Sequence, residues 1–298
     1  MSKIPMQPEP FAAGLDADRI HFLSTGHSDA IILESQGHFA MIDAAEDSDY
    51  PPDKPNLKLR GYEQEVLAYI KKHVRNAQGQ IVFDFVLGTH AHSDHLGGFD
   101  TIINDNDVRV KTAFLKEYRP QTINRYERTR WDNQEVYGQM VAALNSRHVP
   151  VTDQFPACGM MLGNFKLDFF NTAYDTSGKH VGENDNSIVT RVACGGYTAL
   201  LTGDLDNYSG DELRVARQAG HVDLLKLGHH GYIGSTTFRF VHTLRPKYAI
   251  ATNWRAAVYP HVRFNLACHR CPLAGTADHG GIIATFTGGG IRFTDHIM

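Results

Sequence analysis

A histidine-rich motif directly after an apolar run constrains this chain more than any other feature. Residues 89–95 have the sequence Thr-His-Ala-His-Ser-Asp-His and follow an apolar segment, 81–87. That segment predicts a buried strand, so the motif is expected at a strand end. Imidazole and carboxylate groups are the ligands that zinc and similar divalent metals prefer. The sequence therefore predicts a metal site at the edge of a sheet.

The spacing of the motif predicts two neighbouring ions. His90 and His92 can share one ion, and Asp94 and His95 can reach a second ion beside it. The alternative is a polar strand-to-helix turn that happens to be rich in histidine, but four ligand-type side chains in six residues favour the metal interpretation. A helix is expected from Gly97 to Ile103, with its N-terminal amides facing the pocket, where they suit an anionic substrate.

Two later segments repeat this arrangement of an apolar strand followed by ligand-type residues. Segment 198–204 predicts a buried strand ending in Gly-Asp, and Asp204 has two oxygens with which to bridge two ions. Segment 222–231 ends in Gly-His-His-Gly. One of the two histidines is expected to complete the second metal and the other to contact substrate or donate a proton. We take His230 as the ligand and His229 as the catalytic residue, with the reverse left open.

The run His-x-His-x-Asp-His, followed by Leu96-Gly97-Gly98, resembles the metal motif of the metallo-β-lactamase-fold hydrolases. The resemblance implies an α/β fold, a four-layer αββα sandwich with the metals at one edge. Three segments, 183–187, Gly203-Asp204 and 228–231, resemble the corresponding motifs of a narrower subgroup of this family. That subgroup includes the hydrolase domain of ComEC-type DNA-uptake proteins and the phosphorylcholine esterases that act on teichoic acids. These matches span about residues 20 to 255, and segment 249–253 is closer to the esterase-like branch.

The chain departs from the family pattern between the first motif and Asp204. Most of the superfamily has another metal-binding histidine there, whereas this interval contains only His148 and His180, neither in the expected setting. The resemblance then implies that the first metal is bound by His90, His92, Asp204 and water, with Asp185 as a further ligand. Because the subgroup often has a His-Pro near the pocket, His261 or Tyr259 is a candidate acid for the leaving group, with a structural role as the alternative.

These interpretations predict three groups of site residues. The expected metal ligands are His90, His92, Asp94, His95, Asp204 and His230. Catalytic roles are expected for Asp94, His229 and His261. Substrate contacts are expected from Asn184, Asp185, Asn186, Tyr232 and Tyr259.

The opening strands place two further carboxylates near this edge. Segments 20–23 and 30–33 predict a hairpin, and 39–43 predicts a third strand ending in Asp43. Asp29 and Asp43 are expected either to support the metal ligands or to serve in turns. A helix with one apolar face is expected from Tyr62 to Val74.

Composition bounds the organisation of the chain. Its 298 residues, net charge of -4 and 42% hydrophobic content are typical of a soluble globular protein and do not suggest a nucleic-acid clamp. We expect a flexible segment, 1–18, and one domain, 19–298. Within it, a basic and aromatic insertion around 104–150 could bind phosphate or a quaternary amine, or could be a solvated surface. With no signal peptide or membrane anchor in the sequence, a cytoplasmic location without membrane contact is expected; the oligomeric state is left open.

Four cysteines are too few for a disulfide framework at this length. Cys268 and Cys271 have the spacing of half a zinc clasp, but no second pair completes it, so loop thiols are favoured over an extra metal or redox role.

The predicted function is hydrolysis by a hydroxide bridging two zinc ions, with Mn2+ or another divalent metal as an alternative. A phosphodiester, small or carried on a polymer, is the favoured substrate, because the subgroup resemblance and the helix N-terminus both favour an anion. The alternatives are a nuclease acting on DNA or RNA, which the acidic charge disfavours, and a non-catalytic module that binds a metal or ligand.

Overall fold

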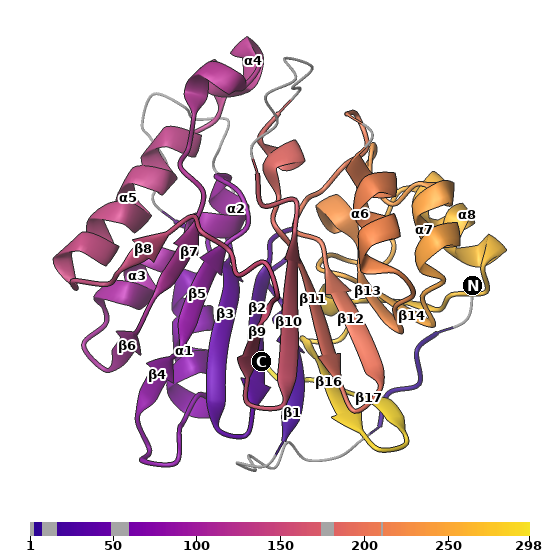
Figure 1. The fold of residues 1–298 in the computed structure, drawn as a ribbon, viewed down its shortest axis with the longest axis horizontal. Helices are drawn as coiled ribbons and strands as arrows, with labels where there is room; N and C mark the ends of the chain where they lie inside the picture. The colour runs from indigo at the N-terminus through magenta and orange to yellow at the C-terminus, as the bar shows by residue number, and fades with distance from the viewer. Residues whose placement is uncertain (1–2, 8–16, 49–59, 174–181, 210) are drawn as a thin grey trace.

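A computed structural model describes residues 3–7, 17–48, 60–173, 182–209 and 211–298. The predicted flexible segment 1–18 falls largely outside these ranges, and so does His180. In Figure 1 two sheets stand between two groups of helices. The expected four-layer αββα sandwich is confirmed.

The larger sheet has eight strands among the described residues, in the order β17-β16-β1-β2-β3-β5-β7-β8. The N-terminal hairpin and third strand lie at its centre, as predicted, and three short parallel strands extend it beyond β3. The strand bounds are β1 Asp18–Phe22, β2 Ala30–Ser35, β3 His38–Ala44, β5 Phe85–Gly88, β7 Ala113–Leu115, β8 Val151–Thr152, β16 Ile282–Thr287 and β17 Gly290–Asp295.

The second sheet has seven strands within the described ranges, in the order β15-β14-β13-β12-β11-β10-β9. Its middle strands β12, β13 and β14 are parallel, so their carboxyl ends meet at one edge. The strand bounds are β9 Met160–Leu162, β10 Phe165–Phe170, β11 Val189–Cys194, β12 Tyr197–Leu201, β13 Leu224–Lys226, β14 Tyr248–Ala251 and β15 Leu273–Gly275.

Three buried apolar clusters correspond to the three interfaces of the sandwich. One lies between the sheets, and each of the others lies between a sheet and its helices. Alternate residues of β2 show the division: Ile31 and Leu33 belong to the cluster between the sheets, whereas Ile32 belongs to the cluster beneath the first group of helices. Both faces of the central strands are therefore buried, which explains why these strands are continuously apolar.

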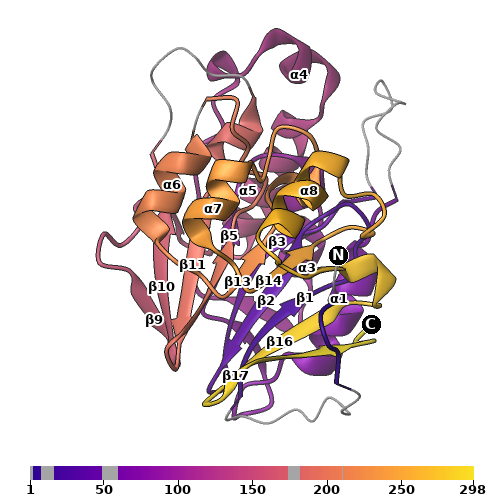
Figure 2. The same cartoon turned by 90° about the vertical axis from the view of Figure 1, so that its right-hand side faces the viewer.

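The first group of helices covers the eight-stranded sheet, and the second covers the seven-stranded sheet (Figure 2). The first group comprises α1 Glu63–His73, α2 Ser93–Leu96, α3 Phe99–Asn104, α4 Arg125–Arg130 and α5 Asn133–Ser146. The second comprises α6 Asp211–Ala219, α7 Phe238–Leu244 and α8 Pro260–Cys268. Within the described part of the chain, no helix has the length and apolar character needed to cross a bilayer.

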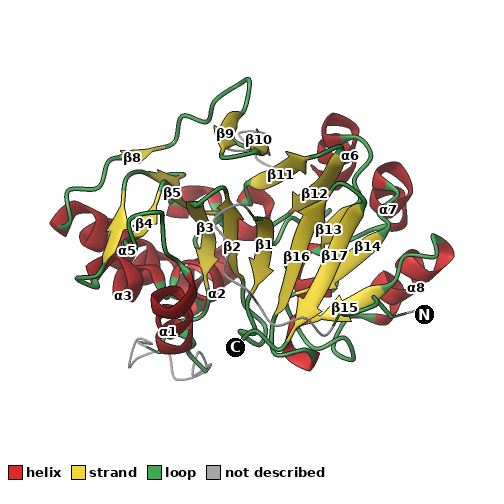
Figure 3. Ribbon diagram, turned by 90° about the horizontal axis from the view of Figure 1, so that it is seen from below, coloured by secondary structure: helices red, strands yellow, loops and turns green. Residues whose placement is uncertain are grey.

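The prediction of one strand over 81–87 was wrong. The chain bends at Asp84, and Figure 3 shows β4 Ile81–Phe83 as a strand separate from β5. Strand β4 pairs with β6 Val108–Val110 in a separate two-stranded sheet (Figure 1). The Asp84 carboxylate faces His38 and Lys111, so the one polar residue in the apolar run marks the break. The expected helix over 97–103 begins two residues later than predicted, at Phe99, with α2 in front of it.

The segment 104–150 supplies β6, β7, α4 and α5, and β7 pairs directly with β5. Cys271 is buried and Cys268 is exposed. Neither cysteine belongs to a cluster of potential metal ligands among the described residues.

Candidate metal centre

Four predicted ligands from three separate segments meet at the edge where the parallel strands end. The ligand atoms of Asp94, His95, Asp204 and His230 all lie within 4.8 Å of one another. Asp94 and His95 are in α2 beyond the end of β5, Asp204 follows β12, and His230 follows β13. Parallel strands bring such loops to one edge regardless of their separation in sequence.

The geometry of this cluster fits a divalent cation. Asp204 uses both oxygens: Oδ1 lies 3.1 Å from His95 Nε2, and Oδ2 lies 3.2 Å from His230 Nε2. Asp94 Oδ2 lies 3.1 Å from the same His230 nitrogen. His95 Nε2 and Asp204 Oδ1 are buried and make no hydrogen bond with any described residue. Buried polar atoms left in this way need a partner, and a metal between them would supply one.

Hydrogen bonds to Nδ1 of His95 and of His230 turn the Nε2 atom of each imidazole ring toward the cluster. His95 Nδ1 lies 2.7 Å from Asp43 Oδ2, and His230 Nδ1 lies 3.0 Å from Thr252 Oγ1. If Nδ1 carries the proton in each case, Nε2 keeps its lone pair for a ligand. The Thr252 hydroxyl donates to Asp29 Oδ1 at 2.5 Å, so Asp29 and Asp43 both support ligands.

A buried lysine lies behind the Asp204 carboxylate. Lys226 is fully buried, and its Nζ lies 2.5 Å from Asp29 Oδ2 and 3.6 Å from Asp204 Oδ1. It also donates to the Gly203 carbonyl oxygen at 2.8 Å. The ammonium therefore fixes the loop that presents Asp204. Sequence analysis missed Lys226, although a lysine inside a continuously apolar strand is an unusual feature.

His90 and His92 form a second pair of candidate ligands beside the cluster. His90 Nε2 lies 3.1 Å from His92 Nδ1, and the rings of His90 and His95 are 4.1 Å apart. On the opposite side of His92, Nε2 lies 2.8 Å from Glu127 Oε1 in α4. The His90 Nδ1 atom lies 3.3 Å from Ser187 Oγ. Glu127 and Ser187 thus orient the two rings. Ser187 ends the run 183–187 on which the subgroup resemblance rests, whereas no sequence pattern marks Glu127.

The Gly-His-His-Gly turn separates the roles of its two histidines. Both have left-handed backbone conformations, with φ values of 46° and 50°. This turn directs His230 into the buried cluster, whereas His229 stays partly exposed with its Nε2 3.9 Å from Asp204 Oδ2. Asn184 Nδ2 lies 3.3 Å from His229 Nδ1. His230 therefore lies among the candidate metal ligands and His229 lies beside them, while the roles assigned to the two residues stay a prediction.

The charges in this centre favour a cation. Burial opposes the charge on His230, but Asp204 together with hydrogen bonds to Asp29 and Asp94 raises its pKa to about 10. Burial also opposes charge on His95, yet Asp204, Asp94 and Asp43 raise its pKa well above the usual value. The carboxylates therefore produce a strongly negative field inside the protein, which attracts a metal ion as well as a proton. For His90, burial and the two neighbouring imidazoles lower the pKa.

The other predicted substrate residues divide between the mouth of the site and its supporting loop. Tyr232 and Tyr259 lie at the mouth with ring centroids 5.8 Å apart, and the Tyr232 hydroxyl lies 3.0 Å from His27 Nδ1. Trp254, another residue that sequence analysis did not select, lies 5.0 Å from His27. His261 is exposed, with its ring 6.1 Å from that of Tyr259.

Asp185 and Asn186 are buried in contacts that hold the loop 183–187. Asp185 Oδ2 accepts a hydrogen bond from Ser209 at 2.9 Å, and Asn186 donates to Glu183 at 3.0 Å. Burial, followed by a hydrogen bond to Asp185 and the charge of that residue, raises the pKa of Asp206 to about 9. Neither Asp185 nor Asn186 belongs to a described cluster of potential metal ligands. His148 is exposed at the end of α5, away from the centre.

Comparison with known proteins identifies the fold. No family model matches the chain. Among solved structures, the metallo-β-lactamase fold protein YhfI from Bacillus subtilis superimposes with a TM-score of 0.50 at 11% identity, covering 87% of this chain and 96% of that one. The chain therefore has the metallo-β-lactamase fold, as its first motif predicted.

Sequence similarity adds a narrower relationship. Recombination protein 2 of Haemophilus influenzae is 26% identical over 230 residues, which are 75% of this chain and 24% of that protein. Competence protein ComA of Neisseria gonorrhoeae is 33% identical over 120 residues, or 38% of this chain and 17% of that protein. ComE operon protein 3 of Bacillus subtilis is 23% identical over 188 residues, which are 62% of this chain and 22% of that protein. The chain thus resembles part of the ComEC-type competence proteins and spans less than a quarter of each.

Proposed function

We propose that this chain is a metal-dependent hydrolase that cleaves phosphodiesters and holds two zinc ions. The observation that carries the proposal is the meeting of Asp94, His95, Asp204 and His230 within 4.8 Å, with buried ligand atoms left without hydrogen bonds. His90 and His92, beside this cluster, would hold the first ion together with Asp204. Metal ions bound there would supply an activated water and positive charge to offset the negative charge that develops on the substrate.

The residues of the chain would bind and orient the substrate around that centre. His229 is partly exposed and fixed by Asn184, so its ring can hydrogen-bond to a substrate oxygen or protonate the leaving group. Tyr232 and Tyr259 form an aromatic wall beside His229 against which a substrate would pack. His261 stands beyond Tyr259 and would act only on a substrate that extends over this wall.

The decisive experiment combines metal content with turnover. Elemental analysis of wild type would be run beside hydrolysis of bis-p-nitrophenyl phosphate and p-nitrophenyl phosphorylcholine, with Asp204→Ala and Asp204→Asn as variants. We expect about two ions per chain in wild type, with loss of metal and activity in both variants. Stoichiometric metal without turnover of any ester would instead support a non-catalytic binding module. Rapid lactam or carboxylic ester cleavage without phosphodiester cleavage would contradict the proposed substrate.

A nuclease is the second candidate, and the surface beside His92 favours it. The short helix α4 carries Arg125, Arg128 and Arg130, and exposed Tyr126 and half-exposed Trp131 lie in or next to it. The Trp131 ring lies 5.0 Å from His92. Cations interleaved with aromatic side chains suit a single strand of nucleic acid, and one similar protein is named for recombination. Cleavage of single-stranded DNA with a steep dependence on salt would support this candidate.

A further inference from the structure

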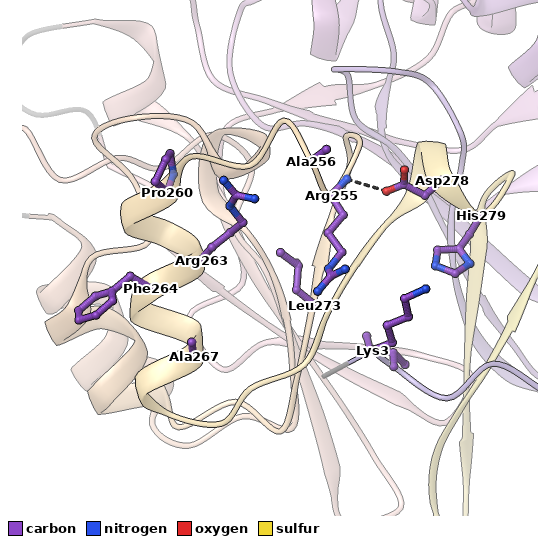
Figure 4. Close-up of a pocket in the computed structure, with 11 residues that line it drawn as sticks. Lys3, Arg255, Ala256, Pro260, Arg263, Phe264, Ala267, Leu273, Asp278 and His279 are labelled. Atoms are coloured by element: carbon purple, nitrogen blue, oxygen red, sulfur yellow. Dashed lines mark hydrogen bonds between the residues drawn. The ribbon is translucent and has the colours of Figure 1, made fainter. Parts of the chain in front are cut away.

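An open cavity of about 790 Å³ lies beside α8, on the seven-stranded sheet's side of the molecule (Figure 4). Four separate segments contribute to its walls. They are the N-terminal residues, the loop after β14, one face of α8 and the turn after β15. Its volume falls within the range of about 300 to 1,000 Å³ typical of small-molecule sites.

The wall of this cavity is rich in cations, although the chain as a whole has a net charge of -4. Lys3, Arg255 and Arg263 line it, together with His279. Figure 4 shows Arg263 on the α8 side of the cavity and Lys3 and His279 on the opposite side, with the Arg255 side chain between them. Neither Lys3 nor Arg263 forms an ion pair with any described residue, so both charges remain available to a ligand.

One carboxylate is present among the described lining residues, and it is already engaged. Asp278 Oδ2 accepts a hydrogen bond from the backbone nitrogen of Arg255 at 2.6 Å. This bond fixes the backbone from which the Arg255 side chain extends into the cavity. The cavity lining therefore carries more positive than negative charge, and the backbone at Arg255 is held in place by Asp278.

Apolar side chains complete the lining. Ile4 and Leu273 are buried beneath the cavity, and Ala267 adds a small apolar surface from α8. A bare inorganic anion would leave most of the volume unfilled. Guanidinium groups bind phosphate through paired hydrogen bonds, and the apolar surface suits an organic substituent.

We propose that this cavity binds a phosphate monoester with a small organic group. Its dianionic phosphate would lie beside Arg255, between Arg263 and Lys3, and its organic group would lie against Ala267. The segment 253–260 separates this cavity from the metal centre: Trp254 contacts His27 at the mouth of that centre, whereas Arg255 and Pro260 line the cavity. The two sites are distinct, and this inference does not depend on the proposed function.

Isothermal titration calorimetry of the full chain tests the inference. The probes are phenyl phosphate, inorganic phosphate and phenol. We expect saturable binding of one phenyl phosphate per cavity, weaker binding of inorganic phosphate and none of phenol. Arg263→Ala should weaken phenyl phosphate binding by about tenfold or more, and adding Lys3→Ala should weaken it further. Arg239→Ala removes an exposed arginine from α7, outside the cavity, and should leave binding unchanged.

The metal centre is the competing location for a phosphate, so Asp204→Ala is measured in parallel. Retained binding in Asp204→Ala, with loss in Arg263→Ala, supports the cavity. The inference is overturned if Arg263→Ala binds phenyl phosphate as wild type does, or if Asp204→Ala alone removes binding. That second result would leave the proposed phosphodiesterase standing.

Discussion

Glu127 Oε1 lies 2.8 Å from His92 Nε2, so a residue from the segment 104–150 orients a ligand of the central motif. Glu127 also accepts a hydrogen bond from Asn133 Nδ2 at 3.0 Å. Burial disfavours the Glu127 carboxylate, but the hydrogen bond and charge of His92 lower its pKa below the usual value. The segment is therefore tied to the metal centre through one carboxylate.

Replacing Glu127 should weaken metal binding without unfolding the protein. In Glu127→Ala, the His92 ring loses the partner that turns Nδ1 toward His90, and affinity for the first ion should fall by about 10- to 100-fold. Glu127→Gln keeps a hydrogen-bond acceptor, so its affinity for the first ion should fall less than that of Glu127→Ala. Competition titration with a chromogenic zinc chelator measures both variants. Glu117→Ala, an exposed glutamate in the same segment, is the control; equal affinity in Glu127→Ala and Glu117→Ala would refute the orienting role.

Sequence reasoning was most successful where ligands are adjacent in the chain. The spacing His90-x-His92-x-Asp94-His95 carries its chemistry within one loop, and the Gly-Asp and His-His pairs follow apolar strands that end at the same edge. Glu127 has no such signal, because its role depends on the packing of elements distant in sequence. The choice between His229 and His230 needed the left-handed turn, which a pair of identical residues cannot reveal.

Substitutions in the histidine pair should separate metal binding from turnover. His230→Ala removes a buried ligand, so we expect metal content to fall together with activity. His229→Ala should keep its metal, because that ring is partly exposed and lies 3.9 Å from Asp204. Its kcat should fall by about 10²- to 10⁴-fold if the ring transfers a proton. Elemental analysis and single-substrate kinetics distinguish the two variants, and metal loss in His229→Ala alone would reverse the assignment.

Lys226 should contribute strongly to stability in the metal-free protein. Lys226→Met removes the buried ammonium that faces the carboxylates of Asp29 and Asp204, which should lower the free energy of unfolding by about 3–5 kcal/mol. Added zinc should restore part of the loss, because the ion supplies positive charge beside Asp204. Urea unfolding with and without zinc measures the effect. Lys247→Met, at an exposed lysine paired with Asp223, should cost no more than about 1 kcal/mol, and a similar small loss in Lys226→Met would contradict the prediction.

Glu212 should make stability fall as the pH rises. Its buried carboxylate accepts hydrogen bonds from the backbone of Thr236 and Thr237, the latter at 3.0 Å, but burial dominates and raises its pKa to about 7. The folded state therefore binds this proton more tightly than the unfolded state. The resulting stabilisation is complete below the ordinary glutamate pKa and is lost between about pH 4.5 and pH 7.

The shift of the Glu212 pKa corresponds to about 3 kcal/mol of stability over that interval. Glu212→Gln cannot ionise, so its free energy of unfolding should lack this component. Other carboxylates also titrate in this range, and the informative quantity is therefore the difference between wild type and variant in urea unfolding at each pH. Glu65→Gln, at an exposed glutamate, should follow wild type. A difference between wild type and Glu212→Gln that stays constant with pH would show that this carboxyl group ionises equally easily in the folded and unfolded states.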